Sequence, residues 1–361
     1  MMRRWAPAIA ALAACSPPPQ GATWRRLDVA PAVHFHGAVG LGDEVWAFGA
    51  TVPPRSEQIH FDGRDWREDL EGAPLTALAG ASAADYSGGP SGVQDTLLSP
   101  SYGEGPFDLL RVLADSDDLI ELTDVWGTGA EDIWVTALVE DIDDPTRVYR
   151  WDGAAWSTVE AVRDVGEWSG LLTYERGCSS EAGRQWIATN KIDGGPYPQI
   201  LHGSETGWSL LIWHSAVAFA LQDGGGVVRA LACAGASIWP IVHVENPTSS
   251  DMVAIWEGAG WGGPLQLEQT GSGVLRLSGV WAADARNGWV VGAEDVDGSL
   301  EPRVWRVMDR RADLVPLDSL DLPSLPAAEG DDYSVLRAVW QTASGRVFVF
   351  GVDGIVLELG G

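Results

Sequence analysis

Apolar and polar residues alternate in short runs along most of this chain, and the runs are separated by turns rich in Gly, Ala, Asp and Ser. The segments 122–137 (LTDVWGTGAEDIWVTA), 277–293 (LSGVWAADARNGWVVGA) and 336–351 (LRAVWQTASGRVFVFG) align without a gap. In each, an alternating run ends in Val-Trp, a turn follows, and a second alternating run contains aromatic residues. Alternation with a period of two on both sides of a short turn predicts a β-hairpin. Looser copies of this first hairpin lie at 34–49, 174–189 and 230–244.

A second kind of hairpin follows several copies of the first. It combines a strand, a tight turn and a strand that opens with Trp, and it occurs at 59–70, 148–160, 200–212 and 254–267. Two of its turns contain Asp62-Gly63 and Asp152-Gly153. Asp and Gly tolerate the positive φ that a two-residue hairpin turn needs, so these dipeptides favour the hairpin. The repeating unit is therefore predicted to be four antiparallel strands.

The aromatic residue of the second strand recurs along the chain at Trp46, Trp134, Trp186, Trp239, Trp289 and Phe348. Successive positions lie 50 to 59 residues apart, except for one interval of 88 residues, which is about two repeats. We therefore expect a degenerate copy near 75–115, and seven units in total. Units of this length with four strands each predict an all-β fold, a seven-bladed β-propeller. Inter-blade packing accounts for most Trp positions, because flat rings fill the space between twisted sheets.

The last unit is one strand short, since the chain ends on GIVLELGG (354–361). An unpaired strand at the end of a sheet would expose a row of backbone donors and acceptors. Near the other end of the chain, GATWRRLDVA (21–30) has strand character and no partner hairpin. Joined, the two read IVLELGG…ATWRRLDV, in register with VYRWDG…AAWSTVEAV of another unit. We expect residues 22–30 to complete the last blade, so that 22–361 is one closed propeller.

The first residues have the pattern of an export signal. Arg3 and Arg4 precede a short apolar run that is too brief to span a bilayer. The run ends in LAAC, which resembles the lipobox of bacterial lipoproteins. The resemblance implies that 1–14 is a signal peptide, that Cys15 becomes the lipidated N-terminus, and that 15–21 is a spacer. The alternative is a cleaved secretory signal with a chance Cys.

The copies containing VWG…DIWV…WDGxxW resemble a bacterial group of exported propeller-repeat lipoproteins. More distantly they are similar to Asp-box and photosynthesis-assembly-factor-like propellers. These motifs are specific for the blade, say little about ligands and carry over no active site. Because Ser16, and not Asp, follows Cys15, the lipoprotein resemblance implies sorting to the outer membrane, on its periplasmic side or the cell surface.

The net charge of the chain limits the classes of partner that it can bind. With 51 acidic and 23 basic residues the formal net charge is −28, which argues against a nucleic-acid partner because no basic face can offset phosphate repulsion. Besides Cys15 the chain has only Cys178 and Cys233. Both align with the first-strand Trp position of neighbouring units once a shorter turn is allowed for. An exported protein favours a disulfide between them, and two buried free thiols are the alternative.

Acidic residues cluster in loops that we expect at one end of the ring. Two of these loops, between second and third strands, offer carboxylates at the spacing that a Ca²⁺ site uses, although the EF-hand pattern fails. The Ca²⁺ candidates are Asp141, Asp143, Asp144, Asp295 and Asp297. Solvated loop charge is the simpler interpretation, and we expect no other cofactor. A negative face for a cationic partner would include Asp115, Asp117, Asp118, Glu140, Glu294, Asp331 and Asp332.

Catalytic signatures are weak. No nucleophile elbow, phosphate loop or zinc motif occurs, and His34 with His36 on one strand face lacks a third metal ligand nearby. We therefore expect a monomeric, lipid-anchored propeller that binds or assembles an envelope protein or a glycan. The alternative is a carbohydrate-active hydrolase or lyase that uses the central channel, since abundant Asp and Glu make many carboxylate pairs available.

Overall fold

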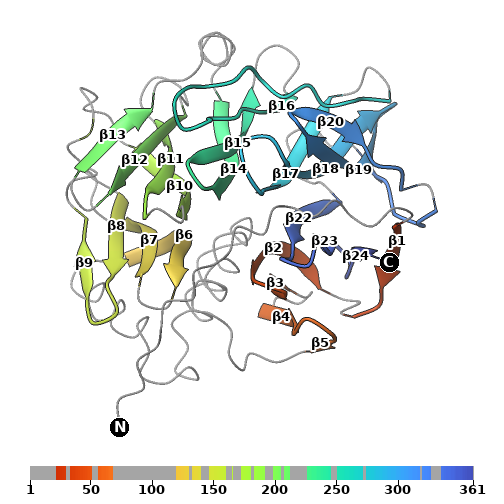
Figure 1. The fold of residues 1–361 in the computed structure, drawn as a ribbon, viewed down its shortest axis with the longest axis horizontal. Coiled ribbons are helices and arrows are strands. Elements are labelled where there is room, and N and C mark those ends of the chain that lie inside the picture. Colours follow the sequence, from red (N-terminus) through yellow and green to blue (C-terminus); the bar gives the residue numbers. More distant parts are fainter. Residues whose placement is uncertain are drawn as a thin grey trace.

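The computed structural model is an all-β propeller, in which antiparallel sheets are arranged around a ring (Figure 1). The described residues form six sheets. The residues that the structure describes are 22–29, 33–50, 56–67, 119–129, 132–139, 146–159, 165, 172–179, 183–191, 198–204, 207–211, 226–244, 250–270, 274–317, 319–326 and 335–360. No helix in this part of the chain is long and apolar enough to cross a membrane.

Three of the sheets have four strands in simple sequence order, as the paired hairpins predicted. The first sheet contains β2 (His34–Leu41), β3 (Glu44–Ala50), β4 (Ser56–Phe61) and β5 (Trp66–Arg67). The next contains β6 (Leu119–Gly129), β7 (Asp132–Val139), β8 (Thr146–Trp151) and β9 (Trp156–Thr158). The third contains β10 (Leu172–Ser179), β11 (Gln185–Lys191), β12 (Gln199–Ser204) and β13 (Gly207–Leu211).

The remaining sheets depart from this plan in different ways. One has three strands, β14 (Gly226–Ala234), β15 (Ser237–Val244) and β16 (Ser250–Val253). Another has β17 (Leu275–Ala282), β18 (Gly288–Val296), β19 (Ser299–Met308) and β20 (Arg311–Leu314), with the short β21 (Leu325–Pro326) also paired to β19. The last, called here the closing sheet, contains β22 (Leu336–Gln341), β23 (Val347–Gly351), β24 (Val356–Gly360) and β1 (Thr23–Leu27).

The hairpin predicted at 254–267 is present in an irregular form. Beyond β16, Trp256 forms isolated antiparallel bridges to Ile238 and to Trp261, and Glu257 N donates to the carbonyl of Gly260 in the turn between the two Trp residues. The sequence EGAGWGGP explains the difference, because several Gly residues and a Pro weaken a continuous strand ladder. The degenerate unit expected near 75–115 lies outside the described residues, so the count of seven blades stays a prediction.

The closing sheet joins the two ends of the chain. Strand β1 pairs antiparallel with β24, with Trp24 opposite Leu359 and Arg26 opposite Leu357. The predicted pairing of the N-terminal segment with the C-terminal strand is therefore confirmed, and β1 lies beside β24 at the edge of the ring (Figure 1). Trp24 is buried, and its ring meets that of Trp289 edge-on at 6.2 Å between centroids. This contact ties the added strand to the preceding sheet.

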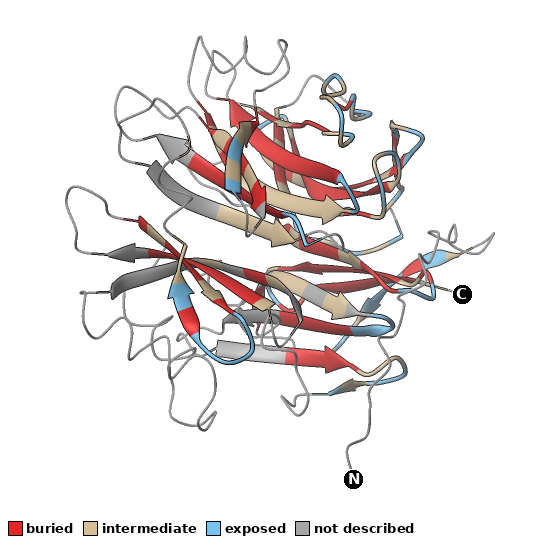
Figure 2. Ribbon diagram, turned by 60° about the vertical axis from the view of Figure 1, so that its left-hand side comes forward, coloured by how far each residue is buried: buried red, intermediate tan, exposed pale blue. Residues whose placement is uncertain are grey.

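The hydrophobic core lies mainly between neighbouring sheets. One cluster combines Phe348 of the closing sheet with Phe61 of the first sheet, and another combines Val339 with Val291 of β18. Buried residues follow the middle strands, whereas exposed residues gather at turns (Figure 2). Packing a wedge of aromatic and branched side chains between twisted sheets is the geometry expected of a propeller.

The first strand of every described sheet carries a β-bulge. A bulge bends its strand and leaves backbone groups outside the ladder, which must find other partners. Several polar side chains supply them across sheet boundaries. Asp124 Oδ2 accepts from Gly177 N at 2.6 Å, and Asp251 Oδ2 accepts from Leu277 N at 2.5 Å. Ser278 Oγ likewise donates to the carbonyl of Leu336.

The second-strand aromatic residues have a recurrent partner on the third strand. An imidazole or guanidinium group lies over the indole ring in four sheets, in the pairs Trp46–His60, Trp134–Arg150, Trp186–His202 and Trp289–Arg306. Each partner is directly opposite its Trp in the strand register. Burial lowers the pKa of His202, with the charge of Arg184 acting in the same direction, so this ring is neutral near pH 7.

Candidate functional site

A cleft of about 420 Å³ lies between the closing sheet and the first sheet. Its walls come from β1 and the residues after it, from the turn that joins β4 to β5, and from β23 and β24. We call it the arginine cleft, because four arginines line it: Arg25, Arg26, Arg64 and Arg346. Three acidic residues line it as well, namely Asp28, Asp65 and Glu358.

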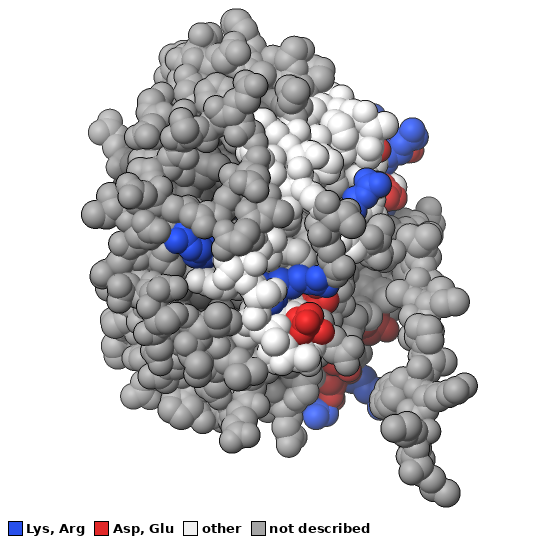
Figure 3. All heavy atoms as spheres, turned by 90° about the vertical axis from the view of Figure 1, so that its left-hand side faces the viewer, with Lys and Arg blue, Asp and Glu red and all other residues white. Residues whose placement is uncertain are grey.

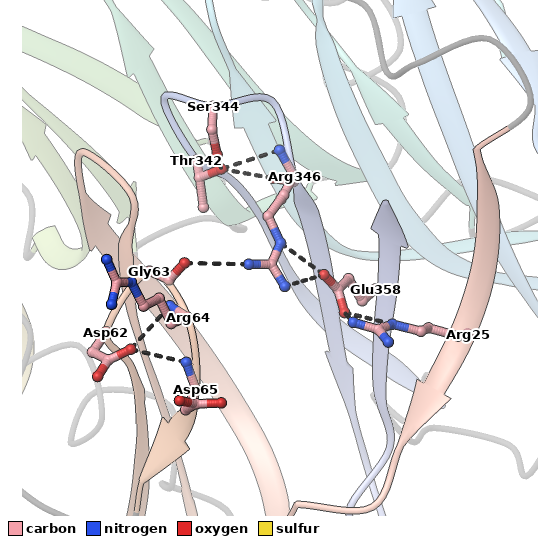
Figure 4. A network of polar contacts seen from close by, with 9 residues as sticks. All are labelled: Arg25, Asp62, Gly63, Arg64, Asp65, Thr342, Ser344, Arg346 and Glu358. Carbon is pink, nitrogen blue, oxygen red and sulfur yellow. Dashed lines mark hydrogen bonds and ion pairs between the residues drawn. The ribbon is translucent and has the colours of Figure 1, made fainter. Parts of the chain in front are cut away.

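Glu358 is the centre of the site. It sits on β24 within an apolar strand, and its side chain is only 2% exposed. Arg25 of the neighbouring β1 donates from Nε to Glu358 Oε2 at 2.8 Å. Arg346 donates from Nε to Glu358 Oε1 at 2.7 Å, and its Nη2 contacts the same oxygen (Figure 4). A buried carboxylate is stable when it is paired and hydrogen-bonded in this way.

Arg346 also reaches the neighbouring sheet. Its Nη1 donates to the carbonyl of Gly63 at 3.4 Å, in the turn between β4 and β5 (Figure 4). The guanidinium carbon lies 4.3 Å from the ring centroid of Phe61 and 5.4 Å from that of Phe348. Stacking on aromatic faces favours a guanidinium over an ammonium group at such a position. Arg346 therefore links the first sheet, β23 and β24 in a single contact.

The turn that carries Arg64 is held by its own Asp. Asp62 Oδ1 accepts from the backbone amides of Arg64 and Asp65, both at 2.9 Å, while Gly63 adopts a φ of 89°. The hydrogen bonds from Asp65 and then Arg64 hold the pKa of Asp62 below its ordinary value of 3.8. Asp62 also pairs with Arg67 at 2.5 Å. The exposed Arg64 side chain is thus presented by an ordered turn and not by a long loop.

Aromatic rings form the base of the arginine cleft. Half-buried Trp66 and buried Phe61 line it, together with the aliphatic Leu27 and Val29. The Trp66 ring meets Phe61 at 5.3 Å and Phe348 at 5.2 Å between centroids. These contacts fix the ring, so that the cleft combines a rigid apolar surface with exposed charges. Such a combination is typical of small-ligand sites.

Sequence reasoning missed this site. Arg25 lies more than three hundred residues along the chain from Arg346 and Glu358, and both arginines look like ordinary surface charges in their own segments. One signal was present, since Glu358 interrupts the apolar run IVLEL (355–359). An acidic residue at a position that faces a core needs a partner, and that requirement pointed to a buried ion pair.

The predicted cysteine pair is joined in the structure by a disulfide, with 5.8 Å between the Cα atoms of Cys178 and Cys233. Cys178 lies opposite Trp186 of the second strand, so it holds the first-strand position that Trp126 holds opposite Trp134. The alignment of Cys233 with that position is wrong by one residue, because Cys233 lies opposite Ile238 and Ala232 lies opposite Trp239. The bond connects β10 with β14, the first strands of neighbouring sheets.

The acidic-face prediction needs one correction. Glu294 is fully buried, where it accepts from Thr270 Oγ1 at 2.6 Å and from Arg303 Nε at 3.0 Å, so it cannot belong to an exposed face. Its position on β18 explains this, since most of that strand is buried. The other members proposed for that face lie outside the described residues: Asp115, Asp117, Asp118, Glu140, Asp331 and Asp332. On the face seen in Figure 3, described acidic and basic side chains lie next to one another.

The calcium candidates are divided between described and undescribed parts of the chain. Asp295 lies near the end of β18 and Asp297 in the tight turn that follows, and Asp295 Oδ1 accepts from Gly298 N at 3.0 Å. Asp141, Asp143 and Asp144 lie outside the described residues, as does Cys15. Among the described residues no three His, Cys, Asp or Glu side chains are grouped as metal ligands.

The two-histidine pattern also changes in the structure. His34 Nδ1 accepts from the backbone amide of Asp353 at 3.3 Å. The bulge between Phe35 and Gly37 interrupts the alternation on which the pairing of His34 with His36 depended. The strand therefore does not provide the regular face that a two-ligand site requires.

No protein-family model matches this chain, and no curated protein matches its sequence. Solved structures do resemble it. YCF48 from Cyanidioschyzon merolae is 14% identical over 93% of this chain and 98% of that chain, with a TM-score of 0.39. A Hadza microbial sialidase is 14% identical over 92% of this chain and 66% of that chain, with a TM-score of 0.47. The fucose-specific lectin from Aleuria aurantia is 12% identical over 91% and 93%, with a TM-score of 0.44. At these identities the likeness concerns the fold alone.

Proposed function

We propose that this protein is a lipid-anchored β-propeller of the bacterial cell envelope that acts as a binding or assembly scaffold for a glycan or protein partner. The observation that carries the proposal is the arginine cleft, which combines exposed guanidinium groups and aromatic rings where two neighbouring sheets meet. Rigid sheets that present polar groups from their turns are suited to recognition. The LAAC motif at Cys15 supports the lipid anchor.

A membrane pull-down tests the scaffold proposal. The tagged, full-length protein is compared with an Arg64→Ala variant, which removes a guanidinium that makes no hydrogen bond or ion pair among the described residues. The matched control is Arg286→Ala, an exposed arginine on the turn between β17 and β18, whose side chain is 66% exposed. We expect partners from envelope extracts to be lost with Arg64→Ala and retained with Arg286→Ala. Identical partner lists for all three proteins would contradict a function for the cleft.

The anchor is tested separately. Replacement of Cys15 by Ser removes the thiol that takes the lipid, so the variant should move from the membrane fraction to the soluble fraction of the envelope. Metabolic labelling with a fatty acid should mark the wild-type protein and leave the variant unlabelled. A wild-type protein that is exported but carries no label would refute the lipoprotein proposal and leave the cleft proposal intact.

A further inference from the structure

We propose that the ring stands on the membrane with the outer edge of the closing sheet against the lipid headgroups, where Arg25 and Arg26 of β1 contact phosphate groups. This inference rests on the proposed lipid anchor at Cys15 and specifies how the anchored protein meets its membrane. It follows from the place of β1 in the fold, from the length of chain between the anchor and β1, and from the distribution of charge.

Strand β1 is the outermost strand of the closing sheet. The order within that sheet is β1-β24-β23-β22, and β22 at its other end contacts β2 and β17, the first strands of the two neighbouring sheets. Figure 1 accordingly shows β1 at the rim of the ring and β22 nearer its centre. A tether attached to β1 therefore holds the ring by its rim and not by either of its faces.

The tether to this edge is short. Thr23, the first residue of β1, follows Cys15 by eight residues, and a chain of that length spans at most about 28 Å when it is fully extended. A compact domain of the length of 22–361 is about 50 Å across. The edge at β1 therefore stays within about half the width of the domain from the lipid, whereas the opposite side of the ring can lie much farther away.

The segment from the anchor to the end of β1 contains no acidic residue. Its charged residues are Arg25 and Arg26, and both side chains are exposed. Arg25 donates to Glu358 on one face of the sheet, and Arg26 donates to the carbonyl of Asp321 at 3.2 Å on the other. A guanidinium carries more N–H donors than these bonds use, so both arginines keep donors for the oxygens of a phosphate group.

The protein as a whole is repelled by the same headgroups. The chain has a net charge of −28, and anionic lipids give a bilayer a negative surface potential. The repulsion falls off over about 8 Å at physiological ionic strength. An upright ring keeps most of its acidic residues beyond that distance, whereas a ring that lies flat brings a whole face against the phosphates. The charge therefore favours the upright orientation on the β1 edge.

The orientation sets where a binding partner is held. Both faces of the ring stay open to solvent, because only the rim meets the lipid. The arginine cleft has β1 as one of its walls, so it lies close to the headgroups. A partner bound in the cleft is therefore brought to the membrane surface.

Quenching by labelled lipid headgroups tests the orientation. The full-length lipidated protein is reconstituted in vesicles of phosphatidylethanolamine and phosphatidylglycerol, in which part of the headgroups carry a nitroxide. A thiol-reactive fluorophore is attached to a Thr23→Cys variant on β1 or, as the matched control, to a Ser209→Cys variant on β13. Both positions are exposed on the last strand of their sheet, and these strands lie on opposite sides of the ring (Figure 1). We expect the probe at 23 to lose most of its emission and the probe at 209 to keep it.

Charge substitutions test the contact of Arg26 with the phosphates. Arg26→Glu should reduce the quenching of the probe at 23, because a carboxylate at this edge is repelled by the headgroups. Arg26→Gln, which loses the charge but can still donate to the carbonyl of Asp321, should have an intermediate effect. Arg286→Glu, on the turn between β17 and β18, should have none. At about 1 M salt, where charges are screened within about 3 Å, the difference between the two probe positions should narrow.

Several outcomes would overturn the inference. Equal quenching at 23 and 209 would show a ring that lies flat or turns freely, and quenching that Arg26→Glu leaves unchanged would show that this edge does not contact the phosphates. A protein that leaves the vesicles and takes up no fatty-acid label would refute the anchor and this inference with it. A labelled, vesicle-bound protein with equal quenching would refute the orientation alone, so the two failures are distinguishable.

Discussion

Replacing Glu358 by Gln should destabilise the closing sheet strongly. The substitution keeps the shape of a side chain that is 2% exposed, but it removes the charge that Arg25 and Arg346 share. One carboxylate oxygen becomes an amide donor, which must face a guanidinium. Breaking a buried ion pair by removing one partner costs about 3–5 kcal/mol. Arg25 is 64% exposed and can recover water, so we expect a loss of about 3 kcal/mol.

Urea unfolding followed by Trp fluorescence measures this loss. Urea is preferable to guanidinium chloride, because the salt would screen the ion pairs under test. The 19 Trp residues of the chain include Trp24 on β1, which packs edge-on against Trp289, so the total emission reports on unfolding of the sheets together. The matched control is Glu257→Gln, which removes a Glu–Arg pair with Arg310 whose carboxylate side chain is 38% exposed.

The control should lose less than about 1 kcal/mol, as is usual for an exposed pair. Both substitutions remove a carboxylate charge from arginine partners, but Glu358 is buried between two arginines, whereas Glu257 is more exposed and pairs with one. If Glu358→Gln and Glu257→Gln lowered the free energy of unfolding by the same small amount, the Glu358 ion pairs would not stabilise the closing sheet. That result would refute the reasoning.

Two further predictions concern other parts of the ring. Reduction of the Cys178–Cys233 disulfide, whose residues are 55 apart, should lower the free energy of unfolding by about 2–4 kcal/mol; urea midpoints measured with and without reductant test this, and a double Ser variant that still responds to reductant would contradict it. The backbone amides of Ala155 and then Ala154 hold the pKa of Asp152 below its ordinary value of 3.8. Its contribution to stability is therefore present above the unfolded-state pKa and is lost as the pH falls through the lower folded-state pKa. Urea midpoints between about pH 2 and pH 6 should thus fall less on acidification for Asp152→Asn than for the wild-type protein, and parallel curves would contradict the assignment.

The repeat pattern predicted most strands of the described sheets, and it also predicted the pairing of β1 with β24. Alternation is local, so Val-Trp runs and Asp-Gly turns can be read without knowing the fold. The segment 254–267 shows the limit of such reading, because Trp256 and Trp261 do pair across a turn while the Gly residues interrupt the continuous ladder of a regular hairpin. The part of this segment that stays in the sheet is the part that pairs with β15, where Trp256 bridges Ile238.

Side-chain roles were harder to predict than strands. Glu294 looked like part of an acidic loop from its neighbours, yet it lies on the buried part of β18 beside Arg303. The neighbours of a residue in the sequence can indicate a loop, whereas the burial of its side chain depends on which sheet packs against it. The arginine cleft could not be predicted for the same reason, because its walls come from both ends of the chain.

The sequence by itself determined the class of fold, the four-strand unit and the need for the N-terminal segment to cover the last strand, because these follow from local periodicity and from the requirement that strand edges be paired. Only the tertiary structure decided that Arg25, Arg346 and Glu358 meet, and that the turn between β4 and β5 lies beside them at a cleft. Contacts between residues so far apart in the chain depend on how two sheets are placed around the ring, and that placement is set by the aromatic packing between them.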